Sequence, residues 1–195
     1  IREGMLYEKM PQMLKDRDPL IEACRFAEAK DSRVPGAGKA LFNFVKPLFS
    51  NSKESQTRLI QAACYLHDVS WRAHPDYRHE ACFDYITRAN LGGLKHSERV
   101  FLGLALLFRY KNSYSRTSFD PLLRLLSSQQ IKDAEILGKA MRLGANLWVT
   151  SAHSEAYVKY AKKKNKLSLK IGELEKKRLG EVSLIRLDSL AETLK

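Results

Sequence analysis

The sequence predicts a mainly α-helical bundle with a small C-terminal α/β tail. Three observations predict this fold class. Apolar residues recur at helical spacing along most of the chain, helix start signals precede several of these stretches, and short polar connections separate them. Helices with one apolar stripe each are stable when those stripes pack together around a common core. We therefore expect a bundle rather than a layered sheet.

Two helices are expected before residue 50. Asp18 suits the N-cap position, and Pro19 suits the first helical turn, where its missing N–H leaves no hydrogen bond unmade. The helix that follows has one apolar face, which is formed by Leu20, Cys24 and Ala27. Helical spacing returns over residues 40–45 until Pro47 interrupts it.

Three central helices follow. Asn51 with Glu54 resembles a capping box, and the apolar stripe of the helix that it opens places His67 beside the buried face. A second helix is expected over residues 76–88, before the pair Gly92-Gly93, and a third over residues 97–110.

The C-terminal part changes in character. Asp120 and Pro121 repeat the N-cap and proline device before a short helix, and a long helix is expected over residues 128–163, with Trp148 on its apolar stripe. Apolar and polar residues alternate over residues 167–171, with Leu167 and Leu169 among the apolar ones, which predicts a strand. Residues 182–194 return to helical spacing. The expected organisation has three parts, namely residues 1–15, a helical domain over 16–164 and a strand–helix tail over 165–195.

Composition limits the partners and the compartment. Lys and Arg number 34 against 22 Asp and Glu, so the formal net charge is +12, which favours polyanionic partners. The sequence has no apolar run long enough to cross a bilayer and no signal-peptide pattern, so we expect a cytoplasmic protein without a membrane partner. Three widely spaced cysteines are expected to be reduced core thiols, namely Cys24, Cys64 and Cys82.

The adjacent residues His67 and Asp68, the HD pair, raise the question of metal chemistry. A neutral imidazole and a carboxylate on neighbouring positions can share a divalent cation, as in metal phosphohydrolases. The alternative is structural, with both side chains forming hydrogen bonds that hold neighbouring helices together.

Four segments resemble the exopolyphosphatase and guanosine pentaphosphate phosphohydrolase family. The opening IREGMLY resembles the segment that closes the second catalytic domain of that family, and AACYLHDVSWRAHPDYRHEACFDYI resembles the HD-like helical domain that follows it. FLGLALLFRYKNS resembles a later helix of the same domain. The terminal LSLKIGELEKKRLGEVSLIRLDSLAETL resembles the family's C-terminal pattern.

The resemblance implies an HD-like bundle in the C-terminal part of a larger enzyme. Family members hydrolyse terminal phosphoanhydrides of inorganic polyphosphate or guanosine pentaphosphate with the help of magnesium, and the reaction takes place in actin-like N-terminal domains that this sequence does not contain. Residues 1–15 would then be the end of a linker from those domains. We expect no catalytic residue and no cofactor in this chain, which would contribute polyphosphate binding and homodimerisation instead.

The sequence also lacks part of the metal-ligand set that an active HD phosphohydrolase uses. Such a site needs a histidine on an earlier helix and a later aspartate, and no histidine precedes His67. Asp84, Asp120 and Asp133 are candidates for the late ligand, but without the first histidine we expect no metal site.

Cations close to the HD pair are the stronger functional candidates. Arg72, Arg78 and His79 follow the pair, and Arg109 with Lys111 ends a later helix, so a basic channel for polyphosphate results if the two regions meet. Ordinary solvated cations are an equally weighted alternative. Two other functions stay open, namely an autonomous HD-type metal phosphohydrolase and a basic nucleic-acid-binding module.

Overall fold

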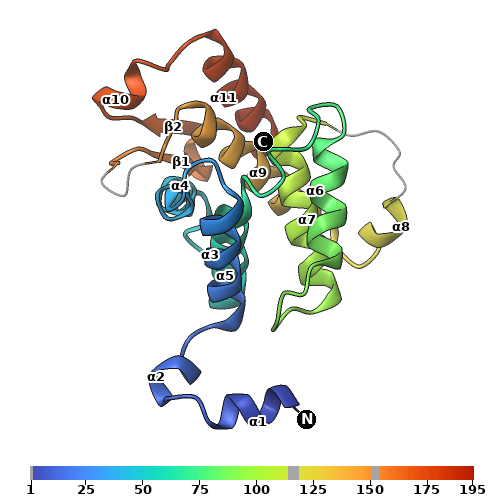
Figure 1. Cartoon of the computed structure of the whole chain (residues 1–195). Helices are drawn as coiled ribbons and strands as arrows, with labels where there is room; N and C mark the ends of the chain where they lie inside the picture. The colour runs from blue at the N-terminus through green and yellow to red at the C-terminus, as the bar shows by residue number, and fades with distance from the viewer. Residues whose placement is uncertain (1, 114–118, 151–153) are drawn as a thin grey trace.

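A computed structural model describes residues 2–113, 119–150 and 154–195, and it confirms a mainly α-helical fold. Figure 1 shows helices gathered into one body, with a short hairpin and the last helix at one end. In chain order the elements are α1 (Arg2–Glu8), α2 (Gln12–Lys15), α3 (Pro19–Asp31), α4 (Ala37–Val45), the 3-10 helix η1 (Lys46–Phe49), α5 (Glu54–Leu66), α6 (Arg78–Arg88), α7 (His96–Tyr110), α8 (Asp120–Leu123), α9 (Ser128–Asn146), β1 (Tyr157–Ala161), the 3-10 helix η2 (Lys162–Lys164), β2 (Lys166–Lys170), α10 (Glu173–Lys176) and α11 (Glu181–Leu194).

Helix α7 is the centre of the core. Each of its residues from Val100 to Arg109 is buried, and α6 and α9 pack against it. The contact with α9 depends on Gly138, because a Cβ atom there would lie 2.4 Å from both the carbonyl oxygen of Ala105 and the Cβ of Phe108. The end of α7 is therefore held in a fixed place relative to α9.

Helices α3, α4 and α5 form the neighbouring part of the bundle. Asp18 caps α3 as expected, since its carboxylate accepts hydrogen bonds from the amides of Leu20 and Ile21. The expected capping box at Asn51 is wrong, because the N-cap of α5 lies two residues later, at Lys53, and no side chain caps the helix. The N-cap expected at Asp120 is also wrong, because Phe119 occupies that position in α8.

The long helix expected over residues 128–163 ends at Asn146. Trp148 adopts a left-handed backbone with φ of 59°, and its amide donates to the carbonyl oxygen of Ala145 while that of Val149 donates to Gly144, which is a Schellman motif. Trp148 is 45% exposed, so its expected place on the apolar stripe is also wrong.

An antiparallel hairpin follows instead of the helix. Strand β1 pairs with β2 from Tyr157 opposite Lys170 to Ala161 opposite Lys166, and the strand expected around Leu167 and Leu169 is confirmed. The helix expected over residues 182–194 is confirmed as α11, and the structure shows that it packs on α9.

Helices α1 and α2 extend away from the body in Figure 1. Lys15 ties them together by donating from its Nζ to the carbonyl oxygen of Glu8 at 2.9 Å. Their apolar side chains are exposed at Met5, Leu6, Tyr7, Met10, Met13 and Leu14. Among the described residues, no helix combines the length and the apolar character that a membrane crossing requires.

Candidate functional site

His67 of the HD pair ends helix α5 as a buried, neutral side chain. It is the C-cap residue of that helix and is 7% exposed. Burial, followed by the positive charge of Arg109, lowers its pKa to about 4. The imidazole is therefore neutral at pH 7, and its Nδ1 donates to the carbonyl oxygen of Cys64 at 2.8 Å.

Asp68 of the HD pair is held by an arginine that sequence analysis missed. The Nε of Arg33 donates to one carboxylate oxygen at 2.8 Å, its Nη2 to the other at 2.6 Å, and its backbone amide to the first at 3.1 Å. Arg109 approaches the same carboxylate, with 3.9 Å between its Nη2 and Oδ1. Asp68 is 2% exposed, so this forked contact is shielded from water on the aspartate side.

These contacts already engage the carboxylate of Asp68 and the Nδ1 of His67. Magnesium requires free oxygen ligands in octahedral geometry, whereas both oxygens of Asp68 already accept hydrogen bonds from Arg33. Within the described ranges, no group of three His, Cys, Asp or Glu side chains could hold a metal ion. The cavity beside the pair, between Arg33 and Trp148, has a volume of about 20 Å³, which has room for about one water molecule.

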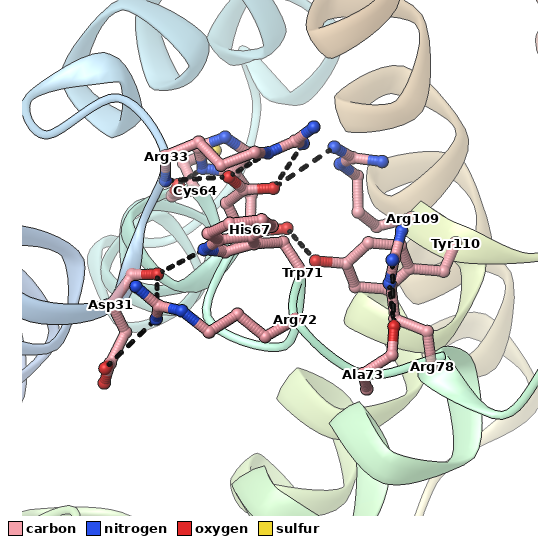
Figure 2. A network of polar contacts seen from close by, with 11 residues as sticks. Asp31, Arg33, Cys64, His67, Trp71, Arg72, Ala73, Arg78, Arg109 and Tyr110 are labelled. Carbon is pink, nitrogen blue, oxygen red and sulfur yellow. Dashed lines mark hydrogen bonds and ion pairs between the residues drawn. The ribbon is translucent and has the colours of Figure 1, made fainter. Parts of the chain in front are cut away.

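Trp71 and Arg72 connect the turn after α5 to the end of α3. The Nε1 of Trp71 donates to the carbonyl oxygen of Asp31 at 2.8 Å, and the guanidinium of Arg72 lies 4.8 Å from the Trp71 ring centroid (Figure 2). Arg72 also reaches the Asp31 carboxylate at 3.9 Å. Its side chain is 64% exposed, so it remains accessible to an anion in solvent.

Arg78 and Arg109 lie beside the ring of Tyr110 in Figure 2, at 5.6 and 4.9 Å from its centroid. Arg78 is oriented by the backbone, since its Nε and Nη2 donate to the carbonyl oxygen of Ala73 at 3.0 and 2.9 Å. The Tyr110 hydroxyl donates to the carbonyl oxygen of His67 at 3.0 Å. The end of α7 thus lies against the turn that follows the HD pair.

His79 and Lys111 form a separate pair between α6 and the residue after α7. The Lys111 Nζ lies 3.0 Å from the His79 Nε2, and His79 is 6% exposed. Burial, followed by the nearby Lys111 charge, lowers the pKa of His79, so the neutral ring accepts the hydrogen bond from Lys111. Lys111 is exposed.

The five basic residues predicted from the sequence therefore occupy two neighbouring groups. Arg72, Arg78 and Arg109 surround Trp71 and Tyr110, and His79 pairs with Lys111. Only Arg72 and Lys111 of the five are both charged at pH 7 and exposed. A third group, containing Arg142 of α9 and Arg186 of α11, was not predicted.

The lysines near residue 160 lie on the hairpin and not at a helix C-terminus. Lys159 belongs to β1 and Lys166 to β2, and both are exposed. The lysines between them form the 3-10 helix η2, at Lys162, Lys163 and Lys164. The dipole of a long helix therefore cannot account for this cluster of positive charge.

Comparison with known families identifies one match. The family described as exopolyphosphatase, C-terminal, matches residues 31–194. This range includes the HD pair, Arg33 and every cation of the two groups described above. No curated protein matches the chain.

Proposed function

The chain belongs to the exopolyphosphatase C-terminal family, and we propose that it binds polyphosphate for its parent enzyme rather than hydrolysing it. The observation that carries this proposal is the family match, which covers nearly all of the bundle. A domain of this kind would hold the polyanion while hydrolysis takes place in other domains of the enzyme.

The charge of the chain supports the binding role. The formal net charge of +12 attracts polyanions over several ångströms and raises their association rate. Arg72 in the turn after α5 and Lys111 directly after α7 present exposed cations, which can contact phosphate oxygens without breaking a core contact. The hairpin lysines extend the same positive potential on another part of the body.

The occupied HD pair supports the non-catalytic role. The hydrogen bonds between Asp68 and Arg33 would have to break before the Asp68 carboxylate could bind a metal ion. The Nδ1 of His67 already forms a hydrogen bond with the backbone. Magnesium, which the family resemblance implies for the complete enzyme, would therefore bind in the catalytic domains. Inorganic polyphosphate and guanosine pentaphosphate both fit the proposed role, since both present phosphate oxygens.

We also propose that the parent enzyme is a cytoplasmic homodimer. Three buried free cysteines suit a reducing compartment. Exposed apolar side chains on α1 and on α11, at Val182, Leu184 and Ile185, offer surfaces that a second subunit could cover. Sedimentation of the chain over a range of concentrations tests self-association, and a monomer throughout would contradict this part.

The binding role is tested with long-chain polyphosphate and the purified chain. We expect binding that weakens steeply with salt, and we expect Arg72→Gln and Lys111→Gln each to reduce the slope of log affinity against log salt by about one. The matched control is Arg88→Gln, because Arg88 lies on the surface of α6 with an 82% exposed side chain.

RNA at matched ionic strength separates polyphosphate from nucleic acid. Preference for RNA with an affinity that depends on its bases would contradict the polyphosphate proposal. Tightly bound stoichiometric metal, with phosphatase activity lost in His67→Ala, would instead support an autonomous metal phosphohydrolase.

A further inference from the structure

Three arginines come from three helices, and the charges of two of them, Arg109 and Arg142, act on the third, Arg186; we call them the arginine cluster. Arg109 lies in the last turn of α7, Arg142 lies in α9 and Arg186 lies in α11. The Nη1 of Arg186 donates to the backbone carbonyl oxygen of Arg142 at 3.3 Å, which fixes the approach of α11 to α9 at this point. Arg109 connects the cluster to Asp68 across 3.9 Å.

Two donors of the arginine cluster are buried without a hydrogen-bond partner. They are the Nε of Arg109 and the Nη1 of Arg142. Buried nitrogen donors are nearly always paired in folded proteins, so an unpaired one points to strain or to a role in binding a polar ligand. Arg109 is 8% exposed, so bulk water does not satisfy it.

The charges of the arginine cluster are also poorly balanced. In the described part of the chain, no carboxylate lies within 4.0 Å of Arg142 or Arg186, and the one beside Arg109 is already bound by Arg33. Burial, followed by the charges of Arg142 and Arg109, lowers the pKa of Arg186 to about 10. All three side chains are still cationic at pH 7, so they repel one another.

We propose that the arginine cluster binds a phosphoryl group, a compact anion whose oxygens would pair the free donors and whose negative charge would reduce the repulsion. Guanidinium groups present forked N–H donors that match tetrahedral phosphate oxygens. Arg142 and Arg186 are half-buried, so part of each side chain is open to solvent, whereas Arg109 is buried.

The phosphoryl group has two possible sources. Free inorganic phosphate supplies it as a separate ligand, and polyphosphate supplies it as one unit of the chain. The arginine cluster differs from the exposed cations of the proposed function, because it contains neither Arg72 nor Lys111. It can therefore exist even if those two residues do not bind polyphosphate.

The experiment measures binding of inorganic phosphate to the 195-residue chain by calorimetry, with chloride added to keep the ionic strength constant. We expect one phosphate per chain, and we expect Arg142→Gln and Arg186→Gln each to weaken it about tenfold or more. Arg88→Gln is the control, because its side chain is exposed and lies on a different helix. A second series with long polyphosphate shows whether the same two substitutions affect the chain ligand.

Thermal unfolding without phosphate distinguishes a binding role from a structural one. Arg186→Gln should raise the midpoint temperature of the phosphate-free chain, because it removes repulsion, and should abolish the stabilisation by added phosphate. Arg186→Lys should retain the charge and still bind more weakly, because it lacks the fork.

Three results would overturn the site. They are no phosphate binding at millimolar concentrations, equal binding by the parent chain and both glutamine variants, or a lower phosphate-free midpoint for Arg186→Gln with the phosphate response unchanged. Loss of polyphosphate binding only in Arg72→Gln and Lys111→Gln would support the proposed function and reject the cluster as a polyphosphate site, while the calorimetry with inorganic phosphate decides whether it binds the free ion. Phosphate binding that depends on Arg142 and Arg186 alone would do the reverse.

Discussion

Replacement of Arg33 by methionine should destabilise the chain by about 3 kcal/mol at neutral pH. Methionine keeps much of the length of the arginine side chain and removes its donors. Asp68 then loses the hydrogen bonds from Nε at 2.8 Å and from Nη2 at 2.6 Å, and it retains the amide of residue 33 and the more distant Arg109. A carboxylate that is 2% exposed cannot recover those bonds from water.

The magnitude follows from the exposure of the two partners. Breaking a buried ion pair costs about 3–5 kcal/mol, and each hydrogen bond to a charged group contributes about 1.5–3 kcal/mol. The Arg33 side chain is 42% exposed, so solvent screening places the effect at the lower end of that range. For a domain of this size, about 3 kcal/mol corresponds to a fall in midpoint temperature of about 6–12 °C.

The pKa of Asp68 determines the pH dependence of the effect. Burial raises this pKa, but the hydrogen bonds from the Arg33 side chain and amide outweigh burial and leave it below the ordinary value of 3.8. Such a carboxyl stabilises the fold above its unfolded pKa, and the contribution is lost as pH falls through the folded pKa. In Arg33→Met, burial meets less opposition, so Asp68 should bind a proton at higher pH. The difference in stability should therefore shrink as pH falls toward about 4.

Urea unfolding followed by far-ultraviolet circular dichroism measures this difference at neutral and acid pH. Arg88→Met is the control, since Arg88 has an 82% exposed side chain and an exposed partner, and it should change stability by less than about 0.5 kcal/mol. A loss below about 1 kcal/mol for Arg33→Met at neutral pH, or an equal loss in acid, would refute the reasoning.

Three further outcomes are expected. Gly138→Ala should destabilise the fold by about 2 kcal/mol because its Cβ has no room between α7 and α9. Gly4→Ala, where nothing lies within 4 Å, should not, and equal losses in urea would contradict this. His67 should titrate by NMR with a pKa of about 4, because of burial and then Arg109, and stability should fall as pH drops from 6.5 toward that value. An unshifted pKa would show an exposed ring. Three cysteines should react with iodoacetamide only on unfolding, namely Cys24, Cys64 and Cys82, because they are buried and burial raises the pKa of their thiols. Rapid labelling of the folded chain would contradict this.

Local signals were sufficient for most of the bundle. The N-cap at Asp18 and the apolar spacing of α5 and α7 depend on residues within a few turns of each other, so the sequence contains both partners. The end of α9 could not be predicted in this way. A tryptophan in a left-handed backbone is rare, and the hairpin that follows is stabilised by pairing between β1 and β2 rather than by local spacing.

The candidate site was predictable only where its residues are neighbours in sequence. The HD pair and the cations after it stand in one stretch, and the family resemblance, which the family match confirms, indicated that they matter. Arg33 was missed because it lies 35 residues before Asp68 and carries no signal of its own. Arg142 and Arg186 were missed for the same reason, since helix packing alone brings them together.

The backbone amides of the helices that carry the arginine cluster should exchange hydrogen at different rates. The amides of α7, which is buried from Val100 to Arg109, should exchange only when the whole domain unfolds. Helix α11 has only Ser183 and Leu190 buried and has Val182 and Ile185 exposed, so its amides should exchange through local opening. Arg109 and Arg186 thus belong to elements that open at very different rates. An anion held between them would slow exchange in α11 and leave α7 unchanged, so occupancy could be followed residue by residue without any measurement of turnover.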